Sequence, residues 1–228
     1  MPRYIEEMVS QQVHRSEIAR QREIEKGITC TNPVVTISRT MGSGARVIAQ
    51  KLADELGWSY WSKDLLDAIA EDANVSRKVV ESFDEKTISE LEMIARAAMG
   101  DHEMTSFVYA KHLAKAIASI GTLGNAIILG RGANLMLPDA LHVRIDASEE
   151  HRINNMVKFE NMDPEDAKAK IRISDKERKT FLIKTFGKQR ANNEIFDLQI
   201  WMDRFTIDNA AAIIKTAIVQ KFDLTCPI

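Results

Sequence analysis

A short apolar segment that leads through a glycine-containing turn into an amphipathic helix constrains the fold of this chain more than any other feature. The segment is VVTIS (34–38), the turn contains Gly42 and Gly44, and the spacing of apolar residues predicts a helix over residues 45–56. β-Branched runs of this length are typical of strands buried in a parallel sheet. Glycines at such a turn let backbone N–H groups approach an anion, and the helix N-terminus adds partial positive charge. The pattern favours a phosphate-binding turn, although strand-to-helix turns also use glycine for purely conformational reasons.

The pattern of apolar residues along the rest of the chain indicates the fold class. Further strands are predicted at NAIILG (125–130) and LHVRID (141–146), with a weaker one at DLQIWM (197–202). Apolar residues recur at helical spacing over residues 63–72, 76–82, 87–99, 104–120, 148–160, 163–186 and 206–220. Strands that alternate with helices predict an α/β fold whose parallel sheet is covered by helices on both faces. No linker interrupts the pattern, so residues 33–220 are expected to form one domain.

Residues 1–26 carry a separate amphipathic pattern. Ile5, Val9 and Val13 recur among many charged residues, and Gly27 ends the pattern. A helix of this kind either packs on the domain or mediates self-association, and the sequence does not separate the two roles. A homo-oligomer formed through residues 1–26 is therefore one expectation.

Charge and apolar content argue against several classes of partner. The 228 residues carry a formal net charge of −2, so no global basic field favours a nucleic acid polymer as partner. No apolar run reaches the roughly 18 residues of a membrane-spanning helix, and the N-terminus lacks the apolar core of a signal peptide. We therefore expect a cytoplasmic protein with no membrane partner. Cys30 and Cys226 have no cysteine or histidine at ligand spacing, so no metal site is expected.

The positive charge of the chain is concentrated in one segment. Residues 168–190 contain nine Lys or Arg residues against two acidic residues. Such a run forms either a solvated helix face or a surface that handles an anion.

Five motifs follow one another along the chain: ISRTMGSGARVIA (37–49), KLADELGWSYWSKDLL (51–66), GRGANLMLPDALHVRIDASEEHRINNM (130–156), DKER (175–178) and DLQI (197–200). In sequence and order they resemble the cytidylate kinases, and more closely the cytidylate kinase-like family. The resemblance extends over roughly residues 33 to 220. It implies a P-loop NTPase-type parallel sheet, a helical acceptor-binding insertion and an arginine-bearing lid at about residues 168–190.

The resemblance also implies the residues around the donor nucleotide. These nucleotide-binding residues are Arg39, Gly42, Ser43, Gly44, Ala45 and Arg46. Ala45 stands where the P-loop pattern GxxxxGK[ST] has its lysine, so the usual cation is missing. Arg39 and Arg46 are the candidates to supply that charge. A pair between Arg46 and an acid on its own helix is the structural alternative.

On the acceptor side, the resemblance implies Ser62, Lys63 and Arg131. Arg131 matches the arginine of the cytidylate kinase GRD motif, which contacts the acceptor phosphate, and a purely structural role is the alternative. Gly132 replaces the aspartate of that motif, and Ser62 replaces an aspartate of the acceptor segment.

The basic segment corresponds to the lid of these kinases. Its candidate cations are Arg172, Lys176, Arg178, Lys179 and Arg190. Phosphoryl transfer depends mainly on positioning and on neutralisation of the transferring group. The expected catalytic cations are therefore Arg46, Lys176 and Arg178.

The activity that follows from the resemblance is transfer of the γ-phosphoryl group of ATP, with Mg²⁺, to a nucleoside monophosphate, with CMP or dCMP as the leading acceptor. Two alternatives stay open. One is a regulatory nucleotide-binding protein without transfer activity, because Ala45, Ser62 and Gly132 all depart from the kinase pattern. The other is a kinase that acts on a different small-molecule acceptor.

Overall fold

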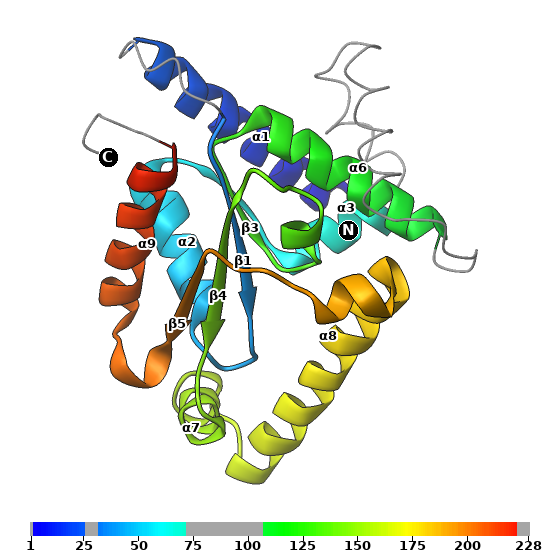
Figure 1. Ribbon diagram of the computed structural model, residues 1–228, viewed down its shortest axis with the longest axis vertical. Helices are drawn as coiled ribbons and strands as arrows, with labels where there is room; N and C mark the ends of the chain where they lie inside the picture. The colour runs from blue at the N-terminus through cyan, green and yellow to red at the C-terminus, as the bar shows by residue number, and fades with distance from the viewer. Residues whose placement is uncertain (1, 26–31, 72–106, 223–228) are drawn as a thin grey trace.

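A parallel sheet of five strands forms the centre of the protein, in the order β2-β3-β1-β4-β5 (Figure 1). The computed structural model describes residues 2–25, 32–71 and 107–222. The strands are β1 (Val34–Arg39), β2 (Ser59–Trp61), β3 (Ala126–Leu129), β4 (Leu141–Asp146) and β5 (Leu198–Trp201). The helices are α1 (Pro2–Glu25), α2 (Ala45–Leu56), α3 (Lys63–Glu71), α6 (Phe107–Leu123), α7 (Glu149–Glu160), α8 (Pro164–Asn192) and α9 (Ile207–Phe222), with two 3₁₀ turns, η1 (Ala133–Leu135) and η2 (Met202–Arg204). The predicted α/β class with an all-parallel sheet is confirmed.

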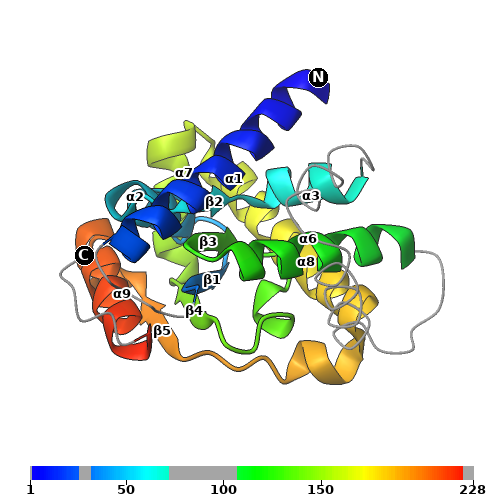
Figure 2. The ribbon, with the colours of Figure 1, turned by 90° about the horizontal axis from the view of Figure 1, so that it is seen from above.

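Helices cover both faces of the sheet (Figures 1 and 2). On one face, α3 and α6 pack over a core that includes Trp61, Ile117 and Ile128. On the other face, α2 and α9 pack over a core that includes Ile37 and Leu52. Both layers exclude water from the central strand β1, whose first four residues are buried. This arrangement explains why the central strands β1 and β3 are largely buried apolar runs rather than alternating ones.

The strand register brings the ends of three strands to one edge of the sheet. β1 pairs in parallel with β3, where Ile37 lies opposite Leu129, and with β4, where Arg39 lies opposite Ile145. The segments that follow these three strands therefore emerge side by side. In open parallel sheets this carboxyl edge is where ligands bind.

Helix α1 covers the outer edge of β2. The backbone N–H of Tyr60 donates to Oε1 of Gln12 at 2.7 Å, and the Ser16 hydroxyl donates to that of Ser59 at 2.8 Å. An edge strand exposes unpaired backbone groups, and α1 supplies a side-chain acceptor for one of them. Val9 and Ala19 of α1 are buried in the cores of the two opposite faces. The helix is thus packed on the domain, while self-association through it stays a prediction.

Several element bounds differ from those expected. The three-residue strand β2 was not predicted, because Ser59–Trp61 is too short to show an alternating pattern. Helix α8 continues past residue 186 to Asn192, with a non-helical kink at Gly187 (φ 80°). The helices predicted at 76–82 and 87–99, and both cysteines, lie outside the described residues. Within the described ranges, no helix is long and apolar enough to cross a membrane.

His142 of β4 provides a test of the buried sheet. Its Nδ1 lies 2.8 Å from Oγ1 of Thr36, and burial lowers its pKa, an effect that Asp197 partly opposes. The unfolded chain therefore binds a proton near pH 6.5 more readily than the folded chain. Stability from the neutral imidazole is complete above that pH and is lost as the pH falls below it.

We expect the melting temperature of the wild type to decrease between pH 7 and pH 5, and the His142→Asn variant to show a shallower decrease. Thermal unfolding followed by circular dichroism over this pH range measures both slopes. Only the slopes are compared, since the substitution also changes packing. Identical slopes would contradict the assignment of a neutral buried histidine.

Candidate functional site

The turn between β1 and α2 contains two glycines in left-handed backbone conformations. Gly42 has a φ of 80° and Gly44 a φ of 83°. A Cβ at Gly42 would lie 2.7 Å from the carbonyl oxygen of Arg152 on α7. Glycine at position 42 is therefore required both by the backbone conformation and by the close approach of α7.

The carbonyl oxygens of four successive residues at this turn accept hydrogen bonds from protein side chains. Arg178 donates to Arg39 O at 2.8 Å, Ser43 to Thr40 O at 2.9 Å, Arg152 to Met41 O at 2.6 Å and Asn155 to Gly42 O at 2.8 Å. Three of the four donors come from α7 and α8. The turn therefore directs its carbonyl groups toward these helices.

Most amide groups of the turn have no acceptor among the described residues, although Thr40 and Ser43 donate to Ile145 O and Thr40 O, respectively. Within the described part of the chain, no acceptor pairs with the N–H groups of Met41, Gly42, Gly44, Ala45 and Arg46. Ala45 and Arg46 begin α2, where the helix itself supplies no acceptor. Consecutive unpaired amides at a helix N-terminus form a concave donor surface suited to an anion.

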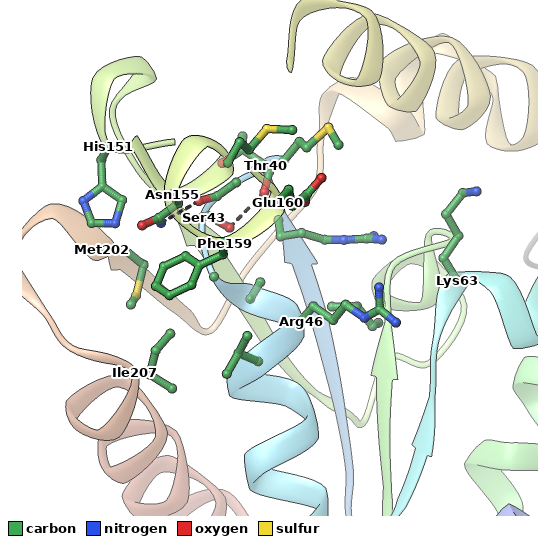
Figure 3. A pocket seen from close by; sticks show the side chains of 18 of the residues that line it. Thr40, Ser43, Arg46, Lys63, His151, Asn155, Phe159, Glu160, Met202 and Ile207 are labelled. Carbon is green, nitrogen blue, oxygen red and sulfur yellow. Dashed lines mark hydrogen bonds between the residues drawn. The ribbon is translucent and has the colours of Figure 1, made fainter. Parts of the chain in front are cut away.

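The residues that carry these N–H groups line a cavity of about 770 Å³, which has two chemically different ends (Figure 3). One end is apolar and aromatic, formed by Phe159, Met202, Phe205 and Ile207. Phe159 is 72% exposed and Phe205 is 41% exposed, so both rings are available to a ligand. The other end is cationic and contains Arg39, Arg46, Lys63 and Arg178. The cavity thus joins a surface for a planar ring to a surface for phosphate groups.

At the cationic end, Ser62 acts as the cap of α3. Its hydroxyl accepts a hydrogen bond from the N–H of Leu65 at 3.2 Å. Serine and aspartate are both favoured at helix N-caps, so the replacement of the aspartate found in similar proteins preserves this local function. The neighbouring Lys63 is half exposed, and its Nζ lies 3.3 Å from Oδ2 of Asp67.

Arg131 is held in a network around Asp67. The guanidinium donates through Nε and Nη2 to both carboxylate oxygens of Asp67, and Tyr109 donates to the same carboxylate at 2.6 Å. The guanidinium also lies over the ring of Phe181, 4.5 Å from its centroid. Burial raises the pKa of Asp67, but the hydrogen bonds from Arg131 and Tyr109 outweigh it, so the net shift is downward. Asp67 is therefore a carboxylate that fixes the orientation of Arg131, which does not itself line the cavity.

The glycine at position 132 is explained by the packing of α8. A Cβ at Gly132 would lie 2.3 Å from Cε2 of Phe186 and 3.2 Å from Cδ2 of Leu182. Any side chain at this position would displace the C-terminal part of α8. The absence of the GRD aspartate is thus coupled to the way that α8 covers η1.

The basic residues of α8 differ in where they lie. Arg178 lines the cavity, whereas Lys176 and Lys179 are exposed and outside its lining. Arg172 lies 3.5 Å from Glu149, and Arg190 donates to Leu135 O at 2.7 Å. The structure therefore brings Arg178 to the site and does not bring the other four lid cations to the cavity lining.

A chain of ion pairs connects α7, α8 and the glycine turn. Arg152, 7% exposed, donates to Asp175 Oδ2 at 2.6 Å, and Asp175 Oδ1 lies 3.9 Å from Arg178. The same two arginines donate to carbonyls of the turn. Asp175 therefore positions both donors. Sequence reasoning missed Arg152 and Asn155, although both lie in the 130–156 motif.

The described residues do not fit a magnesium ion held by the protein. No group of three His, Cys, Asp or Glu side chains comes together in the described ranges. The cavity carboxylates Asp64 and Glu160 face solvent and lie 3.9 Å from Lys63 and 3.1 Å from Lys170, respectively. Mg²⁺ in nucleotide sites often keeps phosphate and water ligands, so the ion would enter with the nucleotide.

Comparisons with known proteins identify a family and similar folds. The sequence model of the cytidylate kinase-like family matches residues 34–204. The crystal structure of an uncharacterized protein from Eubacterium ventriosum superimposes with a TM-score of 0.51 at 21% identity, over 82% of this chain and 98% of that one. TT1252 from Thermus thermophilus has a TM-score of 0.45 and 15% identity, over 85% and 98% of the two chains. No protein with a curated description matches the chain.

The role of Asp175 can be tested by Asp175→Asn. This change leaves Arg152 and Arg178 without a carboxylate, so we expect the free energy of unfolding to decrease by about 1–2 kcal/mol. The dissociation constant for ATP should increase as well, because the turn carbonyls lose their fixed donors. Urea unfolding and calorimetry measure the two effects.

Glu177→Gln on the same helix is the matched control, since Glu177 is exposed and has no partner among the described residues. It should change neither quantity. Equal effects of the two substitutions would mean that Asp175 acts only through the general charge of α8.

Proposed function

Because the chain belongs to the cytidylate kinase-like family, we propose that it transfers the γ-phosphoryl group of ATP to a nucleoside monophosphate, with CMP or dCMP as the leading acceptor. One observation carries the proposal. Four carbonyls of the turn point to side chains, and five amides are left to line a cavity that has an aromatic end and a cationic end. A nucleotide has the complementary parts, a planar base and a row of phosphates.

The donor would bind along the glycine turn. Its phosphates would accept hydrogen bonds from the amides of Gly42, Gly44, Ala45 and Arg46, next to the N-terminus of α2. Its base would then reach Phe159 and Phe205, which flank this end of the cavity. Stacking on exposed aromatic rings tolerates any planar base, so this end provides affinity more than discrimination.

The acceptor would bind at the cationic end. Lys63 and Ser62 line the cavity, and Arg131 lies outside its lining but shares Asp67 with Lys63. Lys63 and Arg131 would supply positive charge for the acceptor phosphate. Arg131 has two guanidinium nitrogens on Asp67, so Asp67 orients the guanidinium while the remaining nitrogen stays available to a phosphate oxygen. The two ends of the cavity would thus bring donor and acceptor phosphates together.

In the reaction, a phosphate oxygen of the acceptor attacks the γ-phosphorus of ATP, and the bond from that phosphorus to the β–γ bridging oxygen breaks. The products are ADP and a nucleoside diphosphate. Negative charge on the transferring group must be balanced, and Arg178 and Arg46 line the cavity where this takes place. Lys176 would act from the lid only after a movement of α8, together with Arg172, Lys179 and Arg190.

Two alternatives have specific support. Ala45 at the lysine position and the close packing of α8 on Gly132 favour a nucleotide-binding protein without transfer activity. The use of Ser62 as a helix cap, with no charge directed at an acceptor, favours a kinase for another small molecule. Both alternatives keep the donor site and differ at the acceptor.

A screen of nucleoside monophosphates with ATP and Mg²⁺, with ADP release as the readout, tests the proposal. We expect turnover with at least one acceptor, and the greatest kcat/KM with CMP or dCMP. Binding of ATP without turnover of any monophosphate supports the regulatory alternative. Absence of ATP binding by calorimetry contradicts the proposal as a whole.

A substitution of Arg131 tests whether this residue acts on the acceptor rather than on the donor nucleotide. In Arg131→Ala we expect KM for the acceptor to increase about tenfold or more, because a charge-assisted contact to its phosphate is lost. The dissociation constant for ATP should change by less than about twofold, since Arg131 does not line the donor end.

The double variant Arg131→Ala, Asp67→Asn is the control for stability, because it does not leave Asp67 as an unpaired carboxylate. Equal losses in ATP binding and acceptor use, in both variants, would mean that Arg131 is structural.

A further inference from the structure

Two arginines of the cavity lining, Arg39 and Arg46, have no counter-charge among the described residues, and of these two only Arg39 is partly buried. Arg131 pairs with Asp67, Arg152 and Arg178 lie next to Asp175, and Arg144 pairs with Asp146. The guanidinium of Arg39 donates no hydrogen bond and forms no ion pair within the described part of the chain. It is nevertheless only partly exposed.

The surroundings of Arg39 increase this imbalance. Burial lowers the pKa of Arg39 to about 10, and repulsion from Arg178 and Arg131 acts in the same direction, while Tyr60 and Asp64 oppose the shift. Burial likewise lowers the pKa of Arg178, with repulsion from Arg152, Arg144 and Arg131 adding to it. The guanidinium groups of Arg39, Arg131 and Arg178 therefore lie near one another. Arg131 pairs with Asp67 and Arg178 lies near Asp175, whereas Arg39 has no carboxylate of its own.

The backbone makes specific room for the Arg39 side chain. A Cβ at Gly130, which follows β3, would lie 1.9 Å from Nη1 of Arg39. The guanidinium thus lies beside the end of β3, on the acceptor side of the glycine turn. Gly130 has a φ of 83°, so both its conformation and its lack of a side chain suit this placement.

Two hydroxyl groups of the cavity lining are also without partners. The hydroxyls of Tyr60 and Thr40 are buried and make no hydrogen bond within the described ranges. Burial raises the pKa of Tyr60, and the positive charges of Arg46 and Arg39 oppose that shift, which places the phenol near both arginines. Buried hydroxyls are normally paired, and each is a donor that an anion would satisfy.

From this geometry we propose that Arg39, with Arg178 beside it and the Tyr60 hydroxyl as a further donor, binds the terminal phosphoryl group of the donor and replaces the missing P-loop lysine. The inference rests on the proposed function for the identity of the donor. The ligand is a dianionic tetrahedral phosphoryl group, which provides the negative charge that the cluster lacks. Arg39, Arg178 and Tyr60 line the same cavity as the glycine turn and Lys63.

A ligand-binding role and a structural role of Arg39 predict different effects of its substitution on the melting temperature. An unpaired guanidinium near two others destabilises the ligand-free protein. Arg39→Gln should therefore unfold at the same temperature as the wild type or at a higher one. A decrease in melting temperature would show that Arg39 supports the fold, and it would overturn the proposal.

Binding is measured by calorimetry with inorganic tripolyphosphate, ATP, AMP and CMP. In Arg39→Gln we expect the dissociation constants for tripolyphosphate and ATP to increase by about 10- to 100-fold, because a charge-assisted contact is lost. AMP has only the α-phosphate and lacks the γ-phosphoryl group of ATP, so its dissociation constant should change less than about threefold. Arg39→Lys should recover part of the loss, and Tyr60→Phe should cause a smaller loss of the same selectivity.

The ligands distinguish the possible results. Weaker CMP binding with unchanged ATP and tripolyphosphate binding would assign Arg39 to the acceptor phosphate and overturn the proposal. Unchanged tripolyphosphate binding in Arg39→Gln, in a protein whose wild type turns over a monophosphate, would overturn this inference and leave the proposed function standing. Loss of tripolyphosphate binding in that variant, with no turnover by the wild type, would reject the proposed function and leave the anion site standing.

Discussion

The hydrogen bonds that α7 and α8 make to the carbonyls of the glycine turn are the interaction on which the site depends. A turn of this kind presents amides or carbonyls to a cavity according to how its peptide planes are oriented. Arg152, Asn155 and Arg178 bind the carbonyls, so the amides face the other way. Among the described residues, no acceptor pairs with the N–H groups of Met41, Gly42, Gly44, Ala45 and Arg46, so these groups are available to water or to a ligand.

The same interactions explain two departures from the kinase pattern. Helix α8 reaches the turn through Arg178 and then packs Leu182 and Phe186 on Gly132. An aspartate at position 132 would collide with this packing, so its absence and the position of α8 belong together. Ser62 keeps the helix-capping function of an aspartate without its charge. Serine at position 62 and glycine at position 132 thus both suit the local structure.

The described residues that line the cavity carry more positive than negative charge. Arg131 and Arg178 each retain one acidic neighbour, and these neighbours orient them. Arg39 retains none and is partly buried. A protein holds such a charge at a cost to its own stability, which is typical of groups that interact with a ligand. The charge distribution therefore supports an anion as the natural occupant of the cationic end.

The sequence alone determined the class of the fold and the location of the glycine turn. Buried strands, amphipathic helices and glycines at a strand-to-helix junction are local patterns, and each is visible within about a dozen residues. The three-residue strand β2 was invisible for the same reason, since its position depends on pairing with β3 and on cover by α1.

Only the tertiary structure decided which charges act at the site. Arg178 meets Arg39 across 139 residues, and Arg131 meets Asp67 across 64, so no local pattern records either contact. Helical spacing groups Arg172, Lys176 and Lys179 on one face of α8, yet it is Arg178 that lines the cavity. Periodicity describes which residues share a face, whereas packing against the rest of the chain determines where that face points.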